Sequence, residues 1–505
     1  MEIKMRRSGV LMAVSSLPGK YGIGCFSAEA YRFIDDLSDA GQSIWQILPL
    51  GPTSYGDSPY QSFSTFAGNP YFIDPDTLVA RKWLTKKECA SYDWGSDPQK
   101  TDYEKIYKAR FRLLKKAYRR SGIASDRGFQ RFVKDNSFWL PDYALFMALK
   151  DAHKGKSWAL WEDPLRFREK EALEAARKKY AVSIEFYEFL QYEFSLEWKE
   201  LKKYANKKGI EIAGDIPIYV AFDSSDTWAE PGLFEFDEEL KPVAVAGCPP
   251  DAFSADGQLW GNPLYDWKVH KKNGYSWWMK RLESSFDMYD IVRIDHFRGF
   301  EEYYRIPYPA ENAVHGKWVR GPGYDIFAMM KKKLGEKKVI AEDLGLITPS
   351  VVRLLKRTGY PGMKVLQFAF DPGQDSVYLP HKYAGNSVVY TGTHDNDTTL
   401  SWYKSVDTKT RRFAAEYLNI PKGAKDRDAV WYFIRSALAS VSDTAIIPMQ
   451  DILALPNSAR MNYPSTIGSN WQWRMKEGAF NNSVKKKLLR LTKLYGRYSR
   501  GNPGK

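Results

Sequence analysis

Acidic side chains follow four short apolar runs of the sequence. In chain order these carboxylates are Asp215, Asp295, Glu342, Asp343 and Asp395. If the runs are the parallel strands of a barrel, their C-terminal ends lie together at one end of that barrel. The reacting groups of barrel enzymes lie at this end. Two carboxyl groups at one mouth, one ionised and one protonated, can cleave a glycosidic bond with retention of configuration. The pattern therefore indicates nucleophilic and acid–base chemistry on a sugar.

A basic residue accompanies the second of these acids. Arg293 lies two residues before Asp295, so the alternation of a strand places both side chains on the same face. A neighbouring cation favours the ionised carboxylate, which suits a nucleophile rather than a proton donor. Alternation does not decide between Glu342 and Asp343 as the second acid. One such acid could be an ordinary strand-end residue, but acids at four strand ends, with two histidines nearby, weigh against that interpretation.

The elements that must position these residues are short and apolar. Runs that are apolar without alternation are buried on both faces, as parallel strands are. The runs are residues 9–14, 43–48, 211–216, 291–294, 339–341, 365–370, 387–390 and 445–448. Many of the gaps between them carry apolar residues at helical spacing. Alternating strands and helices in this number predict an α/β fold, a closed (β/α)8 TIM barrel.

Helical spacing is clearest before the third strand. Apolar residues recur there every three or four positions from 187 to 205, and Gly209 follows where a left-handed helix cap is expected. Similar spacing predicts helices over 103–118 and 484–495. No GxGxxG motif follows a strand, so an open dinucleotide-binding sheet is not expected.

The gaps between the strands are uneven in length. We expect residues 1–505 to form a single catalytic barrel with large insertions in its early βα loops. One insertion, residues 50–205, should be mostly helical and lie between strands two and three. Another, residues 217–287, should be rich in loops and lie between strands three and four. No all-β module follows the eighth strand, so no C-terminal β-sandwich domain is predicted.

Composition excludes several classes of protein. The chain has 505 residues, of which 44% are hydrophobic and 27% charged, as in ordinary globular proteins. Its net charge of +14 comes from short, scattered basic runs rather than one patch or arm, which leaves nucleic-acid binding a minor alternative. No run approaches the roughly 18 apolar residues of a membrane span. The run 9–14 is also shorter than the apolar stretch of a secretory signal.

Neither metals nor cofactors are suggested by the sequence. Cys25, Cys89 and Cys248 lie far apart and have no ligand spacing, which favours a reduced, cytoplasmic location. The six histidines include no pair four residues apart and no ligand triplet. We find no motif for a nucleotide or pyridoxal cofactor. We therefore expect no metal, no cofactor, no nucleic acid and no membrane among the partners.

In combination, several segments resemble a known family. Those around the acids read Gly214-Asp215-Ile216-Pro217-Ile218-Tyr219, Arg293-Ile294-Asp295-His296-Phe297-Arg298, Ala341-Glu342-Asp343-Leu344-Gly345 and Gly392-Thr393-His394-Asp395-Asn396. They resemble the four signature regions of the α-amylase clan, in the form of the amylomaltases, or 4-α-glucanotransferases. Further matching segments are residues 15–24, 58–71, 249–263 and 460–464. The resemblance covers nearly the whole chain.

The resemblance implies a role for each matching residue. Asp295 would be the nucleophile, Glu342 the general acid/base, and Asp395 the third acid, which holds sugar hydroxyls and stabilises the transition state. The resemblance thus chooses Glu342 over Asp343. The implied substrate-binding residues are Tyr60, Asp215, Asp251, Phe253, Gln258, Trp260, Asn262, Arg293, His296, His394 and Asn462.

By this resemblance the protein would be a retaining 4-α-glucanotransferase. It would cleave α-1,4 glucans and malto-oligosaccharides and transfer the glucanosyl unit to the 4-hydroxyl of another glucan or of glucose. An α-1,4-glucan hydrolase of the same clan is the first alternative. A non-catalytic carbohydrate-binding protein is a second, against which the intact set of acids argues. The sequence leaves the oligomeric state open.

Overall fold

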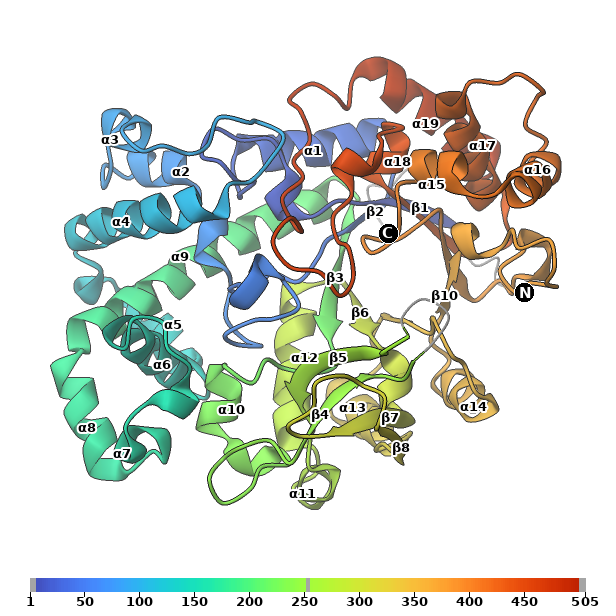
Figure 1. Cartoon of the computed structure of the whole chain (residues 1–505). Coiled ribbons are helices and arrows are strands. Elements are labelled where there is room, and N and C mark those ends of the chain that lie inside the picture. The colour runs from blue at the N-terminus through green and yellow to red at the C-terminus, as the bar shows by residue number, and fades with distance from the viewer. Residues whose placement is uncertain (1–5, 251–254, 499–505) are drawn as a thin grey trace.

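The protein is built around a closed barrel of parallel strands (Figure 1). A computed structural model describes residues 6–250 and 255–498. Around the barrel the strands follow the order β1-β12-β11-β10-β9-β6-β3-β2. Their bounds are β1 Arg7–Leu11, β2 Ile44–Gln46, β3 Glu211–Pro217, β6 Ile291–Asp295, β9 Val339–Ala341, β10 Gly362–Val365, β11 Ser387–Tyr390 and β12 Thr444–Pro448. The predicted TIM barrel is confirmed.

The sixth predicted strand is misplaced. The apolar run 365–370 shares only Val365 with β10, and Leu366–Phe368 form a 3-10 helix instead. Burial continues beyond the strand because Leu366 and Gln367 are also buried in this turn. The prediction was wrong here because a buried turn and a buried strand look alike in an apolar run. The first strand is shifted less, since β1 ends at Leu11 and not at residue 14.

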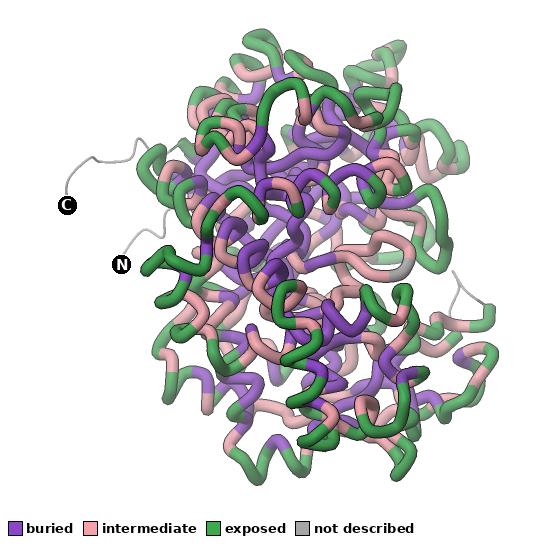
Figure 2. The backbone as a smooth tube through the Cα atoms, turned by 90° about the vertical axis from the view of Figure 1, so that its left-hand side faces the viewer, coloured by how far each residue is buried: buried purple, intermediate pink, exposed green. Residues whose placement is uncertain are grey.

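Helices pack around the outside of the barrel and cover its strands. They are α1 Ala28–Asp39, α9 Ala181–Lys207, α12 Ser276–Met288, α13 Asp325–Leu334, α14 Pro349–Thr358, α17 Asp426–Ala439 and α19 Asn482–Leu494. Gly209 has a φ of 76° just past α9, as its sequence position predicts. Buried residues concentrate in the strands and on the inner faces of these helices, whereas exposed residues lie at the periphery (Figure 2).

A long helical connection joins β2 to β3. Its helices before α9 are α2 Pro75–Ala80, α3 Lys86–Ala90, α4 Tyr103–Ser121, α5 Arg127–Asp135, α6 Leu140–Ala152, α7 Asp163–Arg166 and α8 Lys170–Lys179. In Figure 1 they extend to the left of the barrel. The α6 helix is buried on almost all sides and packs against α9, which anchors this region to the barrel.

A second, four-stranded antiparallel sheet was not predicted from the sequence. Its order is β5-β4-β7-β8, with β4 Ala244–Cys248, β5 Gln258–Pro263, β7 Glu302–Pro307 and β8 Lys317–Arg320. It combines β4 and β5 from the β3–β6 connection with β7 and β8 from the β6–β9 connection. In the sequence, α10 Ser225–Ala229 precedes β4 and α11 Trp267–Lys272 follows β5. Segment 217–287, expected to be rich in loops, thus supplies two strands. Their Gly and Pro residues hid the strand pattern, and Gly247 in fact lies at a β-bulge.

Apart from β12, helices and turns make up the described chain after β11. The remaining helices are α15 Thr399–Ser405, α16 Thr408–Tyr417 and α18 Met449–Ile452. Within the described residues after β12, which run to 498, no further strand occurs, so no β-sandwich follows the barrel there.

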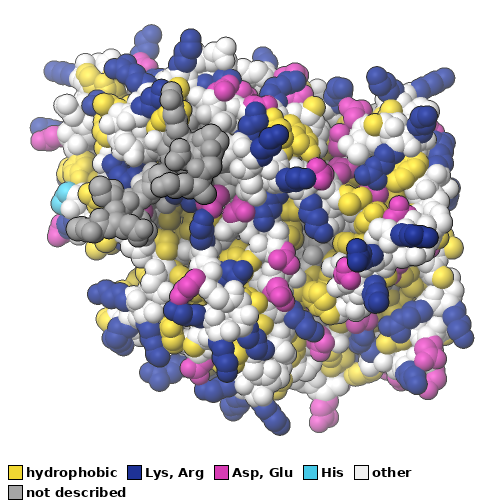
Figure 3. All heavy atoms as spheres, turned by 180° about the vertical axis from the view of Figure 1, so that it is seen from behind, with side chains coloured by type: hydrophobic (Ala, Val, Ile, Leu, Met, Phe, Trp, Pro, Cys, Tyr) yellow, Lys and Arg dark blue, Asp and Glu magenta, His cyan; other side chains and the backbone are white. Residues whose placement is uncertain are grey.

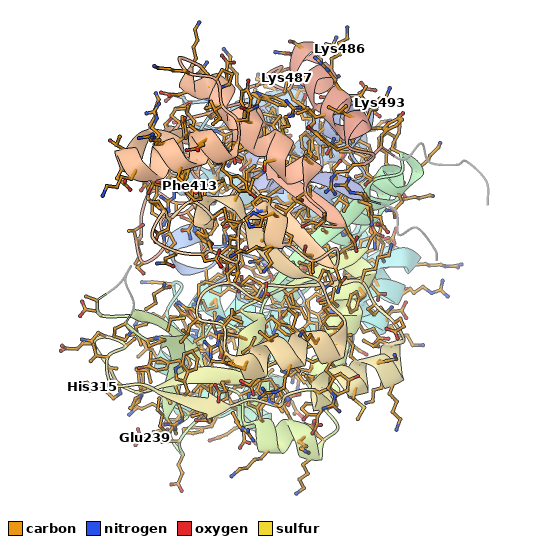
Figure 4. The ribbon with its side chains drawn as sticks, turned by 90° about the vertical axis from the view of Figure 1, so that its right-hand side faces the viewer. Glu239, His315, Phe413, Lys486, Lys487 and Lys493 are labelled. Atoms are coloured by element: carbon orange, nitrogen blue, oxygen red, sulfur yellow. The ribbon has the colours of Figure 1, made fainter. Side chains whose placement is uncertain are left out.

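Charged residues are spread over the surface. On the face in Figure 3, Asp and Glu side chains are scattered among more numerous Lys and Arg side chains. Figure 4 shows Lys486, Lys487 and Lys493 extending outward from α19, and all three are exposed. Lys485 on the same helix instead forms ion pairs with Asp36 and Asp39 of α1. Among the helices of the described chain, none is long and apolar enough to cross a lipid bilayer.

Candidate active site

The strand-end acids meet around one buried arginine. Arg293 on β6 is 3% exposed and donates to both carboxylate oxygens of Asp215 on β3, at 2.8 and 2.7 Å. Its Nη1 also lies 2.9 Å from Oδ1 of Asp295, so the predicted common face of Arg293 and Asp295 is confirmed. Breaking a buried pair of this kind typically costs about 3–5 kcal/mol, because the remaining charge is left uncompensated.

The charge balance at Asp295 differs from the sequence expectation. Burial raises the pKa of Asp295, and the nearby carboxylates of Asp215 and Asp395 add to this, whereas Arg293 and His394 lower it. The net pKa lies above its usual value. The guanidinium contact that the sequence predicted is present, but it offsets only part of the cost of placing a carboxylate in this cavity. The side chain of Asp295 nevertheless remains 31% exposed and can be reached by a ligand.

Glu342 follows β9 and is held by backbone donors. Its Oε2 accepts from the backbone N–H of His296 and its Oε1 from that of Leu344, both at 2.7 Å. Burial and the neighbouring Asp295 carboxylate raise the pKa of Glu342 to about 7, and Arg293 and the two N–H donors only partly oppose this. The carboxyl group is therefore suited to both give and accept a proton near neutral pH.

Asp343 faces a different part of the structure. Its Oδ1 accepts from the backbone N–H of Met363 on β10 at 2.6 Å, and its pKa, raised by burial, responds to Lys364 rather than to Asp295 or Arg293. The two neighbouring acids thus have different surroundings. Glu342 is the acid beside Asp295, whereas Asp343 joins the ends of β9 and β10.

Asp395 is held on two sides. Its Oδ1 accepts from the side-chain amide of Asn462 at 2.7 Å, and its Oδ2 lies 3.3 Å from Nε2 of His394. Burial raises the pKa of Asp395, but His394 and Asn462 outweigh it and bring the pKa to about 2. Burial lowers the pKa of His394, but the Asp395 carboxylate raises it by more than burial lowers it. The net pKa of His394 is therefore above its usual value. This carboxylate stays ionised.

Tyr60 links two sides of the site. Its hydroxyl donates to Oδ2 of Asp215 at 2.8 Å, and its ring stacks on His394 with centroids 5.1 Å apart. The ring of Trp471 lies 5.8 Å from Tyr60 and 5.9 Å from His394. The long β2–β3 connection therefore reaches the acids through Tyr60.

A second wall of the site, formed by residues near Trp260 and His296, is also aromatic. The ring of Trp260 on β5 meets that of His296 edge-on, with centroids 4.9 Å apart, and its Nε1–H donates to Gln258 at 3.1 Å. Burial, with nearby Arg298, lowers the pKa of His296 to about 3, so the imidazole is neutral. Its Nε2 is buried and has no hydrogen-bond partner within residues 6–250 and 255–498.

Asn262 is connected to the same wall. Its side-chain amide donates to the backbone carbonyl of Val220 at 2.7 Å, and its Oδ1 accepts from Gln61 at 3.1 Å. The predicted residues Asp251 and Phe253 lie outside the described residues. Of the predicted set, Asp215 contacts Arg293 and Tyr60, and His394 and Asn462 contact Asp395, whereas Gln258 and His296 contact Trp260, and Asn262 contacts Gln61.

Three further residues were missed by the sequence analysis. Arg460 donates to the backbone carbonyls of Asp395 at 2.6 Å and Asn462 at 2.7 Å, which locks the 460–462 loop onto the end of β11. Trp471 and Tyr219 contribute rings to the two walls. Arg460 could have been found, because it belongs to a segment already noted for Asn462. Trp471 belongs to no recognisable motif, so no signal in the sequence could have revealed it.

Chemically, the site combines groups with opposite proton affinities. One carboxyl group has a pKa near neutrality, one is fully ionised, and one lies beside a permanent cation. No three His, Cys, Asp or Glu side chains in the described part of the chain are grouped so that they could hold a metal ion. This pairing of a protonated and an ionised carboxyl group between aromatic walls is suited to retaining chemistry on a sugar.

Known proteins are similar to this chain in fold and sequence over nearly all of its length. A family model described as 4-alpha-glucanotransferase matches residues 12–480. The chain belongs to this family. A 4-alpha-glucanotransferase of Streptococcus pneumoniae serotype 4 is 51% identical over 499 residues, which cover 98% of both chains. The enzyme of that name from Thermus thermophilus is 47% identical, over 94% of this chain and 95% of its own.

A solved structure in the family has nearly the same fold. The amylomaltase from Streptococcus agalactiae, in complex with acarbose, superposes with a TM-score of 0.95 at 42% identity, covering 98% of this chain and 100% of its own. The amylomaltase from Corynebacterium glutamicum, at 19% identity and a TM-score of 0.76, shares the fold.

Proposed function

We propose that this protein is a retaining 4-α-glucanotransferase. It cleaves an α-1,4-linked glucan or malto-oligosaccharide and transfers the glucanosyl unit to the 4-hydroxyl of another glucan or of glucose. Family membership over residues 12–480 supports this activity. The single observation on which the mechanism depends is the placement of two acids: Glu342 is buried beside Asp295, which raises the pKa of Glu342 to about 7, whereas Asp295 lies 2.9 Å from the guanidinium of Arg293.

In the first step of the proposed mechanism, a bond to Asp295 replaces the glycosidic bond. The protonated carboxyl group of Glu342 donates its proton to the glycosidic oxygen as the bond from the anomeric carbon breaks. The carboxylate of Asp295 attacks that carbon from the opposite face and forms a β-glucosyl ester. Arg293 favours the ionised form of Asp295 that this attack requires, and the contact is 2.9 Å.

The second step reverses the roles of the same groups. The 4-hydroxyl of an acceptor sugar gives its proton to the carboxylate of Glu342 and attacks the anomeric carbon, and the carboxylate of Asp295 leaves. Two inversions give net retention, so an α-1,4 linkage is formed. Because one group must accept and then donate, a pKa close to the working pH serves both steps.

Asp395 is proposed as the third acid. Its low pKa of about 2 keeps it ionised, so it can bind sugar hydroxyls and stabilise positive charge at the anomeric carbon. Asn462 and His394 fix its two oxygens.

Substrate binding is assigned to the two walls. Tyr60 and Trp260 offer ring faces to sugar C–H groups, and the free Nε2 of His296 can bond to a hydroxyl. Further proposed contacts come from Asp215, Gln258, Asn262, Arg293, His394 and Asn462, and by resemblance from Asp251 and Phe253. Because Tyr60 and Gln61 reach Asp215 and Asn262, we propose that the helical insertion 50–205 shapes one side of the glucan groove, and that 217–287 shapes the other.

Product analysis tests the activity. Incubation with maltotriose should give glucose together with a ladder of longer glucans, because acceptor sugars intercept the intermediate. Glucose and maltose alone, without longer chains, would instead establish the hydrolase alternative.

A cytoplasmic location is also proposed. Cys25 and Cys89 are buried free thiols, as is usual in a reducing compartment. Finding the active enzyme in an oxidising compartment of its cell would contradict this.

A further inference from the structure

The carboxyl group of Glu342 is held by two segments that lie far apart in the sequence. One follows β6, where the 3-10 helix η7 Phe297–Phe300 begins, and His296 just before it donates its backbone N–H to Oε2 at 2.7 Å. The other is the turn 343–346, in which the backbone N–H of Leu344 donates to Oε1 at 2.7 Å. The position of both carboxyl oxygens therefore depends on how these two segments are placed relative to each other.

The backbone at His296 has an unfavourable conformation. Its φ of 54° lies in the left-handed region, which costs a residue with a side chain about 1–2 kcal/mol. In this conformation the next N–H, that of Phe297, also reaches the same residue and donates to the backbone carbonyl of Glu342 at 3.1 Å. Such a conformation persists only where its surroundings hold it in place.

The turn 343–346 has few anchors of its own. Gly345 is exposed, and so is 63% of Leu346. Among the residues that the structure describes, 344–347 form one hydrogen bond beyond the Glu342 carboxyl group. In it, the backbone carbonyl of Leu346 accepts from Nη1 of Arg298, on η7, at 2.5 Å. Arg298 thus connects the two segments that hold Glu342.

Arg298 is itself fixed by packing. It is 4% exposed, and its Cζ lies 3.7 Å from the ring centroid of Trp318 on β8. Its Nη2 lies 3.9 Å from Glu302, and both Nε and Nη2 are buried without a hydrogen-bond partner within residues 6–250 and 255–498. Burial lowers the pKa of Arg298, and this is opposed by the titratable groups that face it, which are Cys248, Glu302, Glu301 and Tyr219. The contact with Leu346 is thus the directed one that this buried cation makes there.

We propose that Arg298 is a positioning residue for Glu342. It ties the turn 343–346 to η7, and so keeps the N–H groups of His296 and Leu344 on the two carboxyl oxygens while glucans enter and leave. This role rests on the proposed function, in which Glu342 gives and accepts the proton.

Hydrogen exchange tests the connection without turnover. Arg298→Met keeps the length of the side chain and removes its N–H groups. Exchange in the peptide covering residues 343–348, measured by mass spectrometry, should become about tenfold faster, because the turn opens more often once this hydrogen bond is lost. Arg305→Met is the matched control, since Arg305 on β7 pairs with Glu235 at 3.0 Å, and should leave this exchange unchanged.

Kinetics test whether the connection acts through Glu342. In Arg298→Met, kcat for maltotriose should fall by about 10–100-fold, as misplacement of a catalytic group does, with KM within about twofold of the wild-type value. Fluoride release from maltosyl fluoride, which needs little protonation of the leaving group, should fall much less.

The pH profile gives a third measurement. The groups that face Glu342 are Asp295, Arg293, Tyr378 and the two N–H donors. Loss of a donor to the carboxylate raises the pKa of Glu342, so its protonated form persists to higher pH. The alkaline limb of kcat/KM for maltotriose should therefore move up by about half a unit or more in Arg298→Met.

Two further variants separate positioning from support of the fold. Arg298→Lys should recover part of kcat, because its ammonium can reach the Leu346 carbonyl but cannot lie flat on a ring as a guanidinium does. Trp318→Leu, on a partly exposed strand, should give smaller changes in the same direction and tests the connection if Arg298→Met does not fold.

Wild-type exchange of residues 343–348 in the folded variants would overturn the proposal. So would an unshifted alkaline limb with equal losses for both donors, which would show that Arg298 supports the fold only. Absence of transfer from maltotriose by the wild-type protein would contradict the proposed function alone, since the exchange measurement needs no turnover.

Discussion

At the scale of single residues, the site separates two carboxyl groups by their surroundings. Asp295 has a guanidinium nitrogen at 2.9 Å, whereas Glu342 accepts from two backbone N–H groups, and Arg293 offsets only part of the effect of burial and of the Asp295 carboxylate on its pKa. A shared proton is therefore better placed on Glu342, whose pKa rises to about 7. This division supports the proposal that Asp295 is the nucleophile and Glu342 the acid.

Replacing Asp295 by Asn should abolish transfer. The amide cannot form the glycosyl ester, while its size leaves the packing around Arg293 unchanged. We expect a fall in kcat of at least about 10⁴-fold, as losses of essential nucleophiles show, with an unchanged circular dichroism spectrum. Turnover near the wild-type rate would refute the assignment of the nucleophile.

Replacing Glu342 by Gln should affect donors unequally. Transfer from maltotriose needs a proton on the leaving oxygen, so its first step should slow by about 10²–10⁴-fold. With a maltosyl fluoride donor, whose leaving group needs little protonation, the same substitution should slow formation of the intermediate much less than it does with maltotriose. Pre-steady-state release of fluoride measures this step, and an equal loss with both donors would contradict the role of Glu342.

The pH profile follows from the same pKa. Glu342 must be protonated to donate, and the protonated form is lost as pH rises through about 7. The kcat/KM for maltotriose should therefore fall above about pH 7. Fluoride release by the Glu342→Gln protein should lack this alkaline limb. An alkaline limb that survives unchanged in that variant would show that another group titrates.

At the scale of elements, close packing of β3 against its neighbours places Asp215. A side chain at Gly214 would bring its Cβ within 2.2 Å of the buried Tyr289 ring. We expect Gly214→Ala to lower the free energy of unfolding by about 1–3 kcal/mol and to reduce activity, because β3 must shift. Gly232→Ala, at a site with no atom within 4 Å of the added Cβ, is the control. Equal urea midpoints for the two variants would contradict this packing argument.

The β5 strand should influence the fate of the intermediate. Trp260 on this strand forms part of the wall beside His296. Because an acceptor sugar must occupy its subsite better than water does, we expect Trp260→Ala to increase the share of hydrolysis over transfer. Chromatography of maltotriose products measures that ratio, and an unchanged ratio with a lower rate would assign Trp260 to donor binding instead.

The strands of the barrel could be predicted because burial on both faces leaves continuous apolar runs. The sixth strand was misplaced because its run continues into the buried turn at Leu366. The small sheet escaped prediction because β5 alternates exposed Leu259 with Gly and Pro in a loop-like composition. Sequence therefore predicts elements buried between two layers better than those at the surface.

At the scale of the whole molecule, the site is assembled from distant segments. Asp215 and Arg293 lie on strands β3 and β6, Tyr60, Glu342 and Asp395 lie on separate connections, and the closed order of the strands brings them together. Composition and spacing predicted the acids and the paired Arg293. The roles of Glu342 and of the loop residues came from family resemblance, because single-residue positions on long loops leave no periodic signal.

The most direct test of the account is to identify the residue that carries the sugar. A 5-fluoro-glucosyl fluoride donor with the Glu342→Gln protein should accumulate the glycosyl ester, since its breakdown needs the missing base. Proteolysis at low pH and mass spectrometry should place the added sugar on Asp295, and Asp295→Asn should remove the label. A label on Asp395 or Asp215, or turnover without any labelled peptide, would contradict the proposed covalent mechanism.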